Sequence, residues 1–322
     1  GVLRPFNLDG LLSKVPELER LECSLELKSF EPPIDSSDMA VAQWQEIADI
    51  IAEDYHDYSG FVLLHGSDTM AFTASVLSFM LRGLEKAVVL TGSQLPIGVM
   101  RSDARENLLT ALEIASAKDD QGKPMVPEVC VYFEYDLYRG NRTHKENTED
   151  FEAFRSPNYP KLAEAGVRLK FRQQHILKPR PPFTLHRELN THIGIIYLYP
   201  GINAELVQRI LKTPGYSVFI LLTFGAGNAP NDARLIRVLD MAIREGKVIC
   251  NVSQCRTGGM VQGNYAASEQ LREIGMVGGS DILFEAAWAK LMHLQGLGLS
   301  AEHIKTSFRT PLCGEMTGIE NL

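Results

Sequence analysis

Short apolar runs alternate with longer amphipathic segments along most of this chain, and that order leaves few folds open. The apolar runs predict strands at Val62–His65, Ala87–Thr91, Glu128–Phe133, Ile193–Tyr199, Val218–Phe224 and Lys247–Val252. The amphipathic segments predict helices at Val41–Tyr55, Met70–Leu81, Asp103–Ala115, Ala204–Leu211, Asp232–Arg244 and Phe284–Leu294. Strands that alternate with helices indicate parallel βαβ units, and continuously apolar strands indicate sheets covered on both faces. The sequence therefore predicts an α/β fold with mostly parallel, open sheets flanked by helices.

Two domains are expected, because 322 residues exceed what one compact core usually holds. The alternation stops between Arg168 and His192, where Lys178–Pro182 is rich in proline. Such a segment is typical of an extended linker. We therefore predict an N-terminal domain over residues 1–171, a linker over 172–191 and a smaller C-terminal domain over 192–322.

The net charge, the length of the apolar runs and the cysteine spacing exclude several classes of binding partner. A net charge of −8 argues against nucleic acid or an anionic membrane, and no apolar run approaches the roughly 20 residues of a membrane span. The cysteines form no C-x-x-C and no metal-binding spacing, which favours reduced thiols in a cytoplasmic protein. No H-E-x-x-H occurs, so no metal is expected. The cysteines are Cys23, Cys130, Cys250, Cys255 and Cys313.

The clearest candidate for chemistry follows the apolar run Phe61–Leu64. There Ser67 and Asp68 stand at the C-terminal end of a predicted strand, which is where ligands bind in open α/β sheets. The pair fits two interpretations, a cluster capping the next helix or a catalytic hydroxyl beside a charged partner. A catalytic hydroxyl needs a base, and Lys145, in a polar loop after another predicted strand, is available. His65 fits either a Ser–His pair or a core histidine hydrogen-bonded to backbone.

Other strand ends also finish in polar or glycine-rich turns. Gly66 and Gly92 would let backbone N–H groups approach a ligand closely. Asp35–Met39 fits either caps for the helix that follows or a turn that binds a carboxylate. Gly225-Ala-Gly-Asn228 begins like a dinucleotide-binding turn, but Pro230 stands where a third glycine is needed.

Taken together, these segments resemble the bacterial-type L-asparaginases of the asparaginase/glutaminase family, most closely the cytoplasmic type I branch. The resemblance covers nearly the whole chain in order. It runs through Asp35–Met39, Gly60–Met70, Leu90–Pro96, Tyr138–Lys145, Ser156–Asn158, Tyr199–Ile202 and Gly225–Pro230.

The resemblance implies a function. An L-asparaginase converts L-asparagine to L-aspartate and ammonia, needs no cofactor and assembles as a homodimer or homotetramer. Ser67 occupies the position of the family's second catalytic hydroxyl, Asp68 that of its paired aspartate and Lys145 that of its lysine. These three would form a Ser–Lys–Asp proton shuttle, with Asp68 also holding the substrate's ammonium group.

The resemblance also implies binding positions. Asp35, Ser36 and Ser37 match the turn that grips the substrate's carboxylate and ammonium groups, and Ser93 sits where a backbone carbonyl faces the side-chain amide. Asn228 matches an asparagine that reaches the active site of a neighbouring subunit. His144 and Cys255 stand near a second, regulatory asparagine site of some type I enzymes, although the family pattern has threonine at the position of His144.

Two departures from the family pattern matter. Ser67 stands where threonine is usual, and nothing matches the family's primary threonine nucleophile on its first strand. Gly1–Phe6 resembles the segment after that strand and its mobile loop, so we expect the first strand upstream of Gly1. The alternatives are a glutaminase or other small-amide hydrolase, or a non-catalytic amino-acid-binding protein if the strand is absent.

Overall fold

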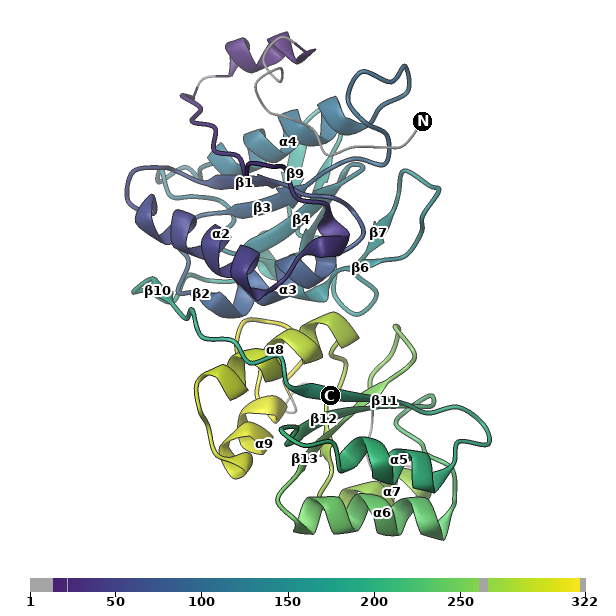
Figure 1. The fold of residues 1–322 in the computed structure, drawn as a ribbon. Helices are drawn as coiled ribbons and strands as arrows, with labels where there is room; N and C mark the ends of the chain where they lie inside the picture. Colours follow the sequence, from purple (N-terminus) through teal and green to yellow (C-terminus); the bar gives the residue numbers. More distant parts are fainter. Residues whose placement is uncertain (1–13, 22, 261–265, 319–322) are drawn as a thin grey trace. The chain divides into compact units, whose positions relative to one another are not determined.

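The computed structural model describes residues 14–21, 23–260 and 266–318 (Figure 1). The expectation for Gly1–Phe6 lies outside these residues. The chain divides into two compact units, Gly1–Arg187 and Glu188–Leu322. Among the described residues, no helix has the length and apolar character needed to cross a membrane.

The first unit is built on a six-stranded sheet with strand order β1-β3-β4-β5-β8-β9. Strands β1 (Phe61–Leu64), β3 (Val88–Thr91) and β4 (Val129–Phe133) are parallel. Strands β5 (Asp136–Arg139), β8 (Ala163–Ala165) and β9 (Leu169–Phe171) extend this sheet in antiparallel fashion, which the sequence analysis did not predict.

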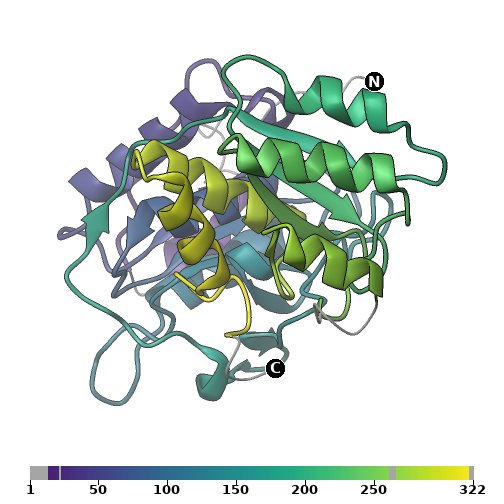
Figure 2. The same cartoon turned by 90° about the horizontal axis from the view of Figure 1, so that it is seen from below.

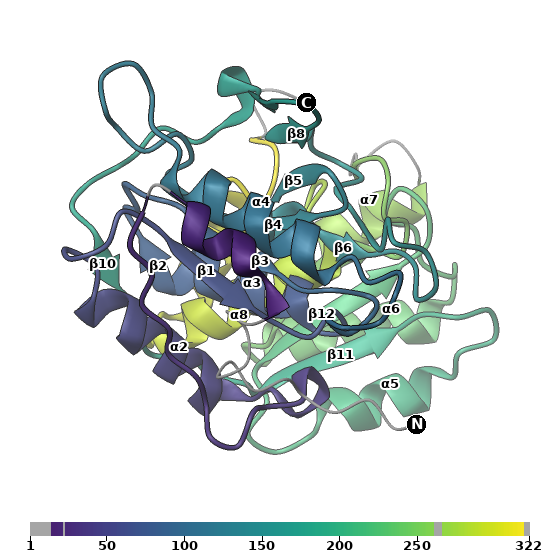
Figure 3. The same cartoon turned by 90° about the horizontal axis from the view of Figure 1, so that it is seen from above.

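Helices cover both faces of this sheet (Figures 1 and 3). Helix α4 (Ala104–Ser116) packs its apolar stripe on one face, where Ala111 and Ile114 join the core under β3 and β4. Helix α3 (Met70–Met80) covers the other face and is buried all round, because α2 (Val41–Glu53) packs against its outer side. Both faces of the central strands are thus sealed from water.

Short elements complete the first unit. Strand β2 (Leu81–Arg82) pairs with β10 (Thr184–Leu185), and β6 (His144–Lys145) pairs with β7 (Phe154–Arg155), both antiparallel. The 3-10 helices among the described residues of this unit are η2 (Pro16–Arg20), η3 (Ser36–Asp38), η4 (Gly140–Arg142) and η5 (Gln173–His175).

The stretch predicted as an extended linker, residues 172–191, contains η5 and β10 and is tied to the first unit. Glu128 and Arg139 form a buried ion pair of 2.7 Å. Glu128 accepts the Leu177 N–H at 2.7 Å, and Arg139 donates to the His175 carbonyl at 2.8 Å. The ion pair therefore satisfies backbone groups of this segment, and such bonds leave no periodic signal in the sequence. The domain bounds themselves stay a prediction.

The second unit holds a parallel sheet of β11 (Ile193–Tyr197), β12 (Val218–Thr223), β13 (Val248–Ser253) and β14 (Val277–Gly278). Figure 2 shows α5 and α6, in green, side by side, and α8 and α9, in yellow, as a second pair. The helices of this unit are α5 (Ala204–Leu211), α6 (Ala233–Arg244), α7 (Ala266–Glu273), α8 (Phe284–Gly296) and α9 (Ala301–Arg309).

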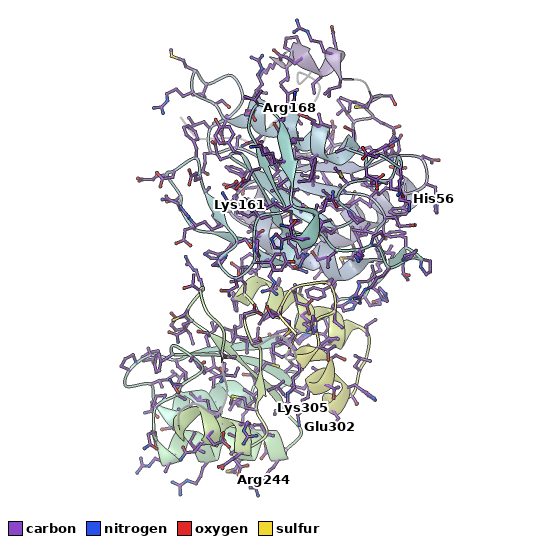
Figure 4. The ribbon with its side chains drawn as sticks, turned by 180° about the vertical axis from the view of Figure 1, so that it is seen from behind. His56, Lys161, Arg168, Arg244, Glu302 and Lys305 are labelled. Atoms are coloured by element: carbon purple, nitrogen blue, oxygen red, sulfur yellow. The ribbon has the colours of Figure 1, made fainter. Side chains whose placement is uncertain are left out.

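The segment after α9 is fastened by a fully buried ion pair. Lys290 on α8 contacts Glu315 at 2.6 Å, and both side chains are 0% exposed. Lys290 also donates to the carbonyls of Phe308 and Thr310, while Glu315 accepts the Leu312 N–H at 3.0 Å. By contrast, the Lys305–Glu302 pair of 2.8 Å lies on the outside of α9 (Figure 4).

The predicted α/β class with mostly parallel sheets is confirmed. Every strand and helix predicted above is present, with bounds that differ by at most two residues. One detail was wrong: Asp35 caps η3, and α2 begins after Ala40, whose N–H donates to Gln43 Oε1 at 3.1 Å. All five cysteines carry free thiols, and burial raises the pKa of the Cys130 and Cys250 thiols.

Candidate active site

Ser67, Asp68 and Lys145 meet at the C-terminal end of β1. Lys145 Nζ donates to Ser67 Oγ at 2.9 Å and lies 2.5 Å from Asp68 Oδ1. The lysine side chain is only 15% exposed, whereas that of Asp68 is 69% exposed. Protein atoms thus shield Lys145, while the Asp68 carboxylate faces solvent. Lys145 Nζ contacts both the Ser67 hydroxyl and the Asp68 carboxylate.

His65 does not pair with Ser67. Its Nδ1 lies 2.7 Å from the Gly66 carbonyl oxygen and its Nε2 lies 2.9 Å from Thr73 Oγ1. The predicted hydrogen bond to backbone is therefore confirmed, although His65 is half-buried and lies at the margin of the core, and the Ser–His interpretation is wrong.

The Asp35–Ser37 turn lies against the turn that carries Ser67. Thr69 Oγ1 donates to the Ser36 carbonyl at 2.6 Å. Gly66 approaches Ser36 so closely that a Cβ at position 66 would lie 2.5 Å from Ser36 Oγ. The Ser37 hydroxyl and N–H donate to Asp35 Oδ1 at 2.7 and 2.9 Å, and these hydrogen bonds lower the pKa of Asp35. An exposed carboxylate and an exposed hydroxyl thus stand beside the Ser67 turn.

The loop after β3 is held by two buried polar residues that were not singled out from the sequence, Asp103 just before α4 and Asn107 within it. Asp103 accepts the Gln94 N–H at 2.9 Å and the Leu95 N–H at 3.0 Å. Asn107 donates to the Gly92 carbonyl at 3.0 Å. These bonds fix the backbone on either side of Ser93. The only available signal was an aspartate at the start of a predicted helix, which is also a common capping residue.

Gln94 was also missed. Its Oε1 lies 3.4 Å from Ser67 Oγ, and its Nε2 donates to the Asp150 carbonyl at 2.9 Å. Asp150 belongs to the loop between β6 and β7, so Gln94 links the Ser67 turn to the hairpin that carries Lys145. No motif spacing would have identified it.

The remaining predicted residues are more dispersed. His144 immediately precedes Lys145 on β6, so the two side chains leave opposite faces of the strand. Asn228 and Cys255 belong to the second unit, in the turns after β12 and β13. Asn228 closes its turn by donating its N–H to the Phe224 carbonyl at 2.8 Å, and Cys255 is exposed.

Strand β1 lies at the edge of the sheet as far as the described residues go, since β3 is its one partner there. Its apolar side chains are incompletely covered, and Leu64 is 44% exposed. An apolar, parallel strand with an open edge is the kind of surface that proteins usually cover or pair.

Comparisons with known proteins cover both units. Residues 1–177 match the family model described as Asparaginase, N-terminal, and residues 192–308 match the Glutaminase/Asparaginase C-terminal domain. L-asparaginase 1 of Escherichia coli K12 is 40% identical over 320 residues, which covers 97% of this chain and 90% of that protein. The 60 kDa lysophospholipase of Mus musculus is 43% identical over 290 residues, or 89% of this chain and 50% of that one.

A solved structure agrees with these sequence matches. L-asparaginase I from Vibrio cholerae superposes with a TM-score of 0.87 at 41% identity, covering 96% of this chain and 92% of the other.

Proposed function

The chain belongs to the asparaginase/glutaminase family, and from this premise we propose that it is an L-asparaginase that hydrolyses L-asparagine to L-aspartate and ammonia. The single observation that carries the chemistry is the position of Lys145 Nζ, in contact with both Ser67 Oγ and Asp68 Oδ1. An amine so placed can move a proton to and from a hydroxyl while the carboxylate balances its charge.

The reaction requires two displacements at the amide carbon. A hydroxyl oxygen attacks the carbon, its proton passes through Ser67 and Lys145, and ammonia leaves with a proton to give an acyl-enzyme ester. Water then attacks the ester carbon and releases aspartate. Backbone N–H groups at the Gly66 and Gly92 turns are the candidates for stabilising negative charge on the amide oxygen.

We assign Ser67 to the second hydroxyl of this apparatus. The primary nucleophile would be a threonine on a strand paired with the open edge of β1. The exposed Leu64 and the apolar character of β1 support a strand at that place. Its side chains would then be delivered to the same end of the sheet as Ser67, because parallel strands present their C-terminal ends together.

The binding groups suit a small zwitterion that carries an amide. Asp35, Ser36 and Ser37 would hold the substrate's carboxylate and ammonium groups together with Asp68. Gly66 and the backbone at Ser93 would face the amide. We further propose a cytoplasmic homo-oligomer in which Asn228 of a neighbouring subunit completes the site. A regulatory role for His144 and Cys255 stays a prediction, which a sigmoidal rate curve made hyperbolic by Cys255→Ser would support.

The test compares kcat/KM for L-asparagine and L-glutamine, measured by ammonia release from the full-length protein. A clear preference for asparagine supports the proposal. Because one methylene in a pocket is worth only about 1–3 kcal/mol, residual turnover of glutamine is expected. A preference for glutamine would favour the glutaminase alternative, and asparagine binding without ammonia release would favour a binding protein.

A further inference from the structure

A chain of hydrogen bonds runs from helix α2 to the backbone of the Ser67 turn. Trp44 Nε1 donates to Thr73 Oγ1 at 2.9 Å, and Thr73 Oγ1 lies 2.9 Å from His65 Nε2. On the other side of the imidazole, Nδ1 lies 2.7 Å from the Gly66 carbonyl oxygen. Thr73 on α3 thus links Trp44 on α2 to the histidine ring at the end of β1.

The donors and acceptors of these hydrogen bonds can be assigned in only one consistent way. A carbonyl oxygen only accepts, so His65 Nδ1 carries the proton that Gly66 receives. Burial lowers the pKa of His65, and the bond to Gly66 only partly opposes this, so the ring is neutral at pH 7 and Nε2 accepts. Thr73, which is fully buried, accepts from Trp44 and donates its own hydroxyl proton to Nε2.

The hydrogen bond from His65 Nδ1 to the Gly66 carbonyl orients the peptide group between Gly66 and Ser67. A peptide is planar, so fixing the Gly66 carbonyl toward His65 points the Ser67 N–H to the opposite side. Within the described residues this N–H meets no acceptor, which leaves it available to a ligand. Gly66 is also confined by Ser36, so the peptide is held from two directions.

We propose that His65 is a positioning residue: as the neutral Nδ1–H tautomer it fixes the Gly66–Ser67 peptide, so that Ser67 presents its hydroxyl to Lys145 and its N–H to the substrate. The inference rests on the asparaginase activity proposed above. A histidine that merely fills the core would need the right volume but no particular hydrogen-bond direction.

Two substitutions of His65 distinguish a role in positioning the Gly66–Ser67 peptide from a role in packing alone. In His65→Asn the side-chain amide can replace Nδ1 as donor to Gly66, whereas in His65→Gln it reaches toward Thr73 and leaves Gly66 without its donor. His65→Asn should keep most of the wild-type kcat. His65→Gln should lower kcat by about 10- to 100-fold with a smaller change in KM, because a misplacement of about 1 Å can cost about 100-fold.

Ile51→Ala is the matched control, since Ile51 is a buried residue of α2 outside the hydrogen-bond chain. It should lower Tm without lowering kcat. The role of His65 is overturned if the Asn and Gln variants have equal kcat. It is also overturned if Ile51→Ala, at a similar loss of Tm, reproduces the kcat of His65→Gln.

A second measurement uses the wild-type protein and needs no turnover. Nitrogen-15 NMR of histidine-labelled protein, with the His65 signal identified by its loss in His65→Asn, should show a neutral ring protonated at Nδ1 at pH 7. A ring protonated at Nε2, or at both nitrogens, contradicts the proposal. Absence of ammonia release by the wild type would instead refute the proposed function. Equal Asn and Gln variants of an active enzyme would refute only the role of His65.

Discussion

Lys145 Nζ lies 2.9 Å from Ser67 Oγ although 78 residues separate the two in the chain. The register of a short hairpin explains the contact, because β6 places Lys145 opposite Phe154 of β7. Phe154 is buried and packs on Phe133, at the end of β4, with ring centroids 5.0 Å apart. The lysine is therefore anchored to the sheet through the aromatic residue across from it.

Phe154→Ala should loosen this anchor and reduce activity without touching the catalytic groups. Removing a buried phenylalanine costs about 3–5 kcal/mol of stability, and kcat should fall as Lys145 loses its fixed position. Phe154→Leu, which keeps most of the volume, should retain more of both. Urea unfolding and ammonia release from asparagine measure the two effects. A Phe154→Ala enzyme with wild-type kcat would show that β7 does not hold Lys145.

Ser67 should tolerate threonine and not alanine. Ser67→Thr keeps the hydroxyl and adds the methyl group that restricts its rotamer, so turnover should persist. Ser67→Ala removes the proton relay and should lower kcat by about 10²- to 10⁴-fold. Steady-state kinetics of the two variants decide the point. Equal activity of the threonine and alanine variants would remove Ser67 from the mechanism.

Gly66→Ala should raise KM for asparagine, because the new Cβ would lie 2.5 Å from Ser36 Oγ and push the two turns apart. The double variant Gly66→Ala/Ser36→Gly relieves that overlap. It should therefore lose less affinity than the sum of the two single changes predicts. A strictly additive double-mutant cycle would argue against this contact as the cause.

The Lys290–Glu315 pair should make stability depend on pH. Burial disfavours the charged carboxylate, but Lys290 and the backbone N–H donors outweigh this and lower the pKa of Glu315 below its ordinary value of 4.5. Because the unfolded chain then binds the proton more readily, this stabilisation is present above about pH 4.5 and lost as pH falls through the folded-state pKa.

Glu315→Gln tests that account directly. At pH 7 it should reduce the free energy of unfolding by about 3–5 kcal/mol, because Lys290 stays buried without its countercharge. The variant should also lose the acid-side pH dependence described above. Urea unfolding at several pH values measures both. An unchanged pH profile would exclude Glu315 as its source.

The sequence predicted those parts of the fold that carry a continuous pattern. Strands β1, β3 and β4 and their helices were found because their apolar runs are uninterrupted. Strands β5, β8 and β9 were missed because they are short and carry polar residues such as Asp136 and Lys170. Their place in the sheet depends on pairing partners, which no local pattern records.

The site was predictable to a similar extent. The residues alone identified the Ser67 turn and left Lys145 as one available base, and the family resemblance selected it. The sequence did not identify Gln94, Asp103 or Asn107 as site residues. They bond to carbonyl and N–H groups of loops, and nearly every residue carries such groups. Hydrogen bonds from a side chain to a distant backbone have no spacing that a sequence can show.

Ammonia release by Lys145→Met is the sharpest test of the proton-transfer role assigned to Lys145. Methionine keeps much of the side-chain volume and removes the amine, so kcat on asparagine should fall by about 10²- to 10⁴-fold. Lys161→Met is the matched control, because Lys161 is an exposed lysine of the same unit, paired with Asp136 at 2.7 Å (Figure 4). We expect a loss of turnover for Lys145→Met and wild-type turnover for Lys161→Met. Wild-type turnover by Lys145→Met would contradict that role.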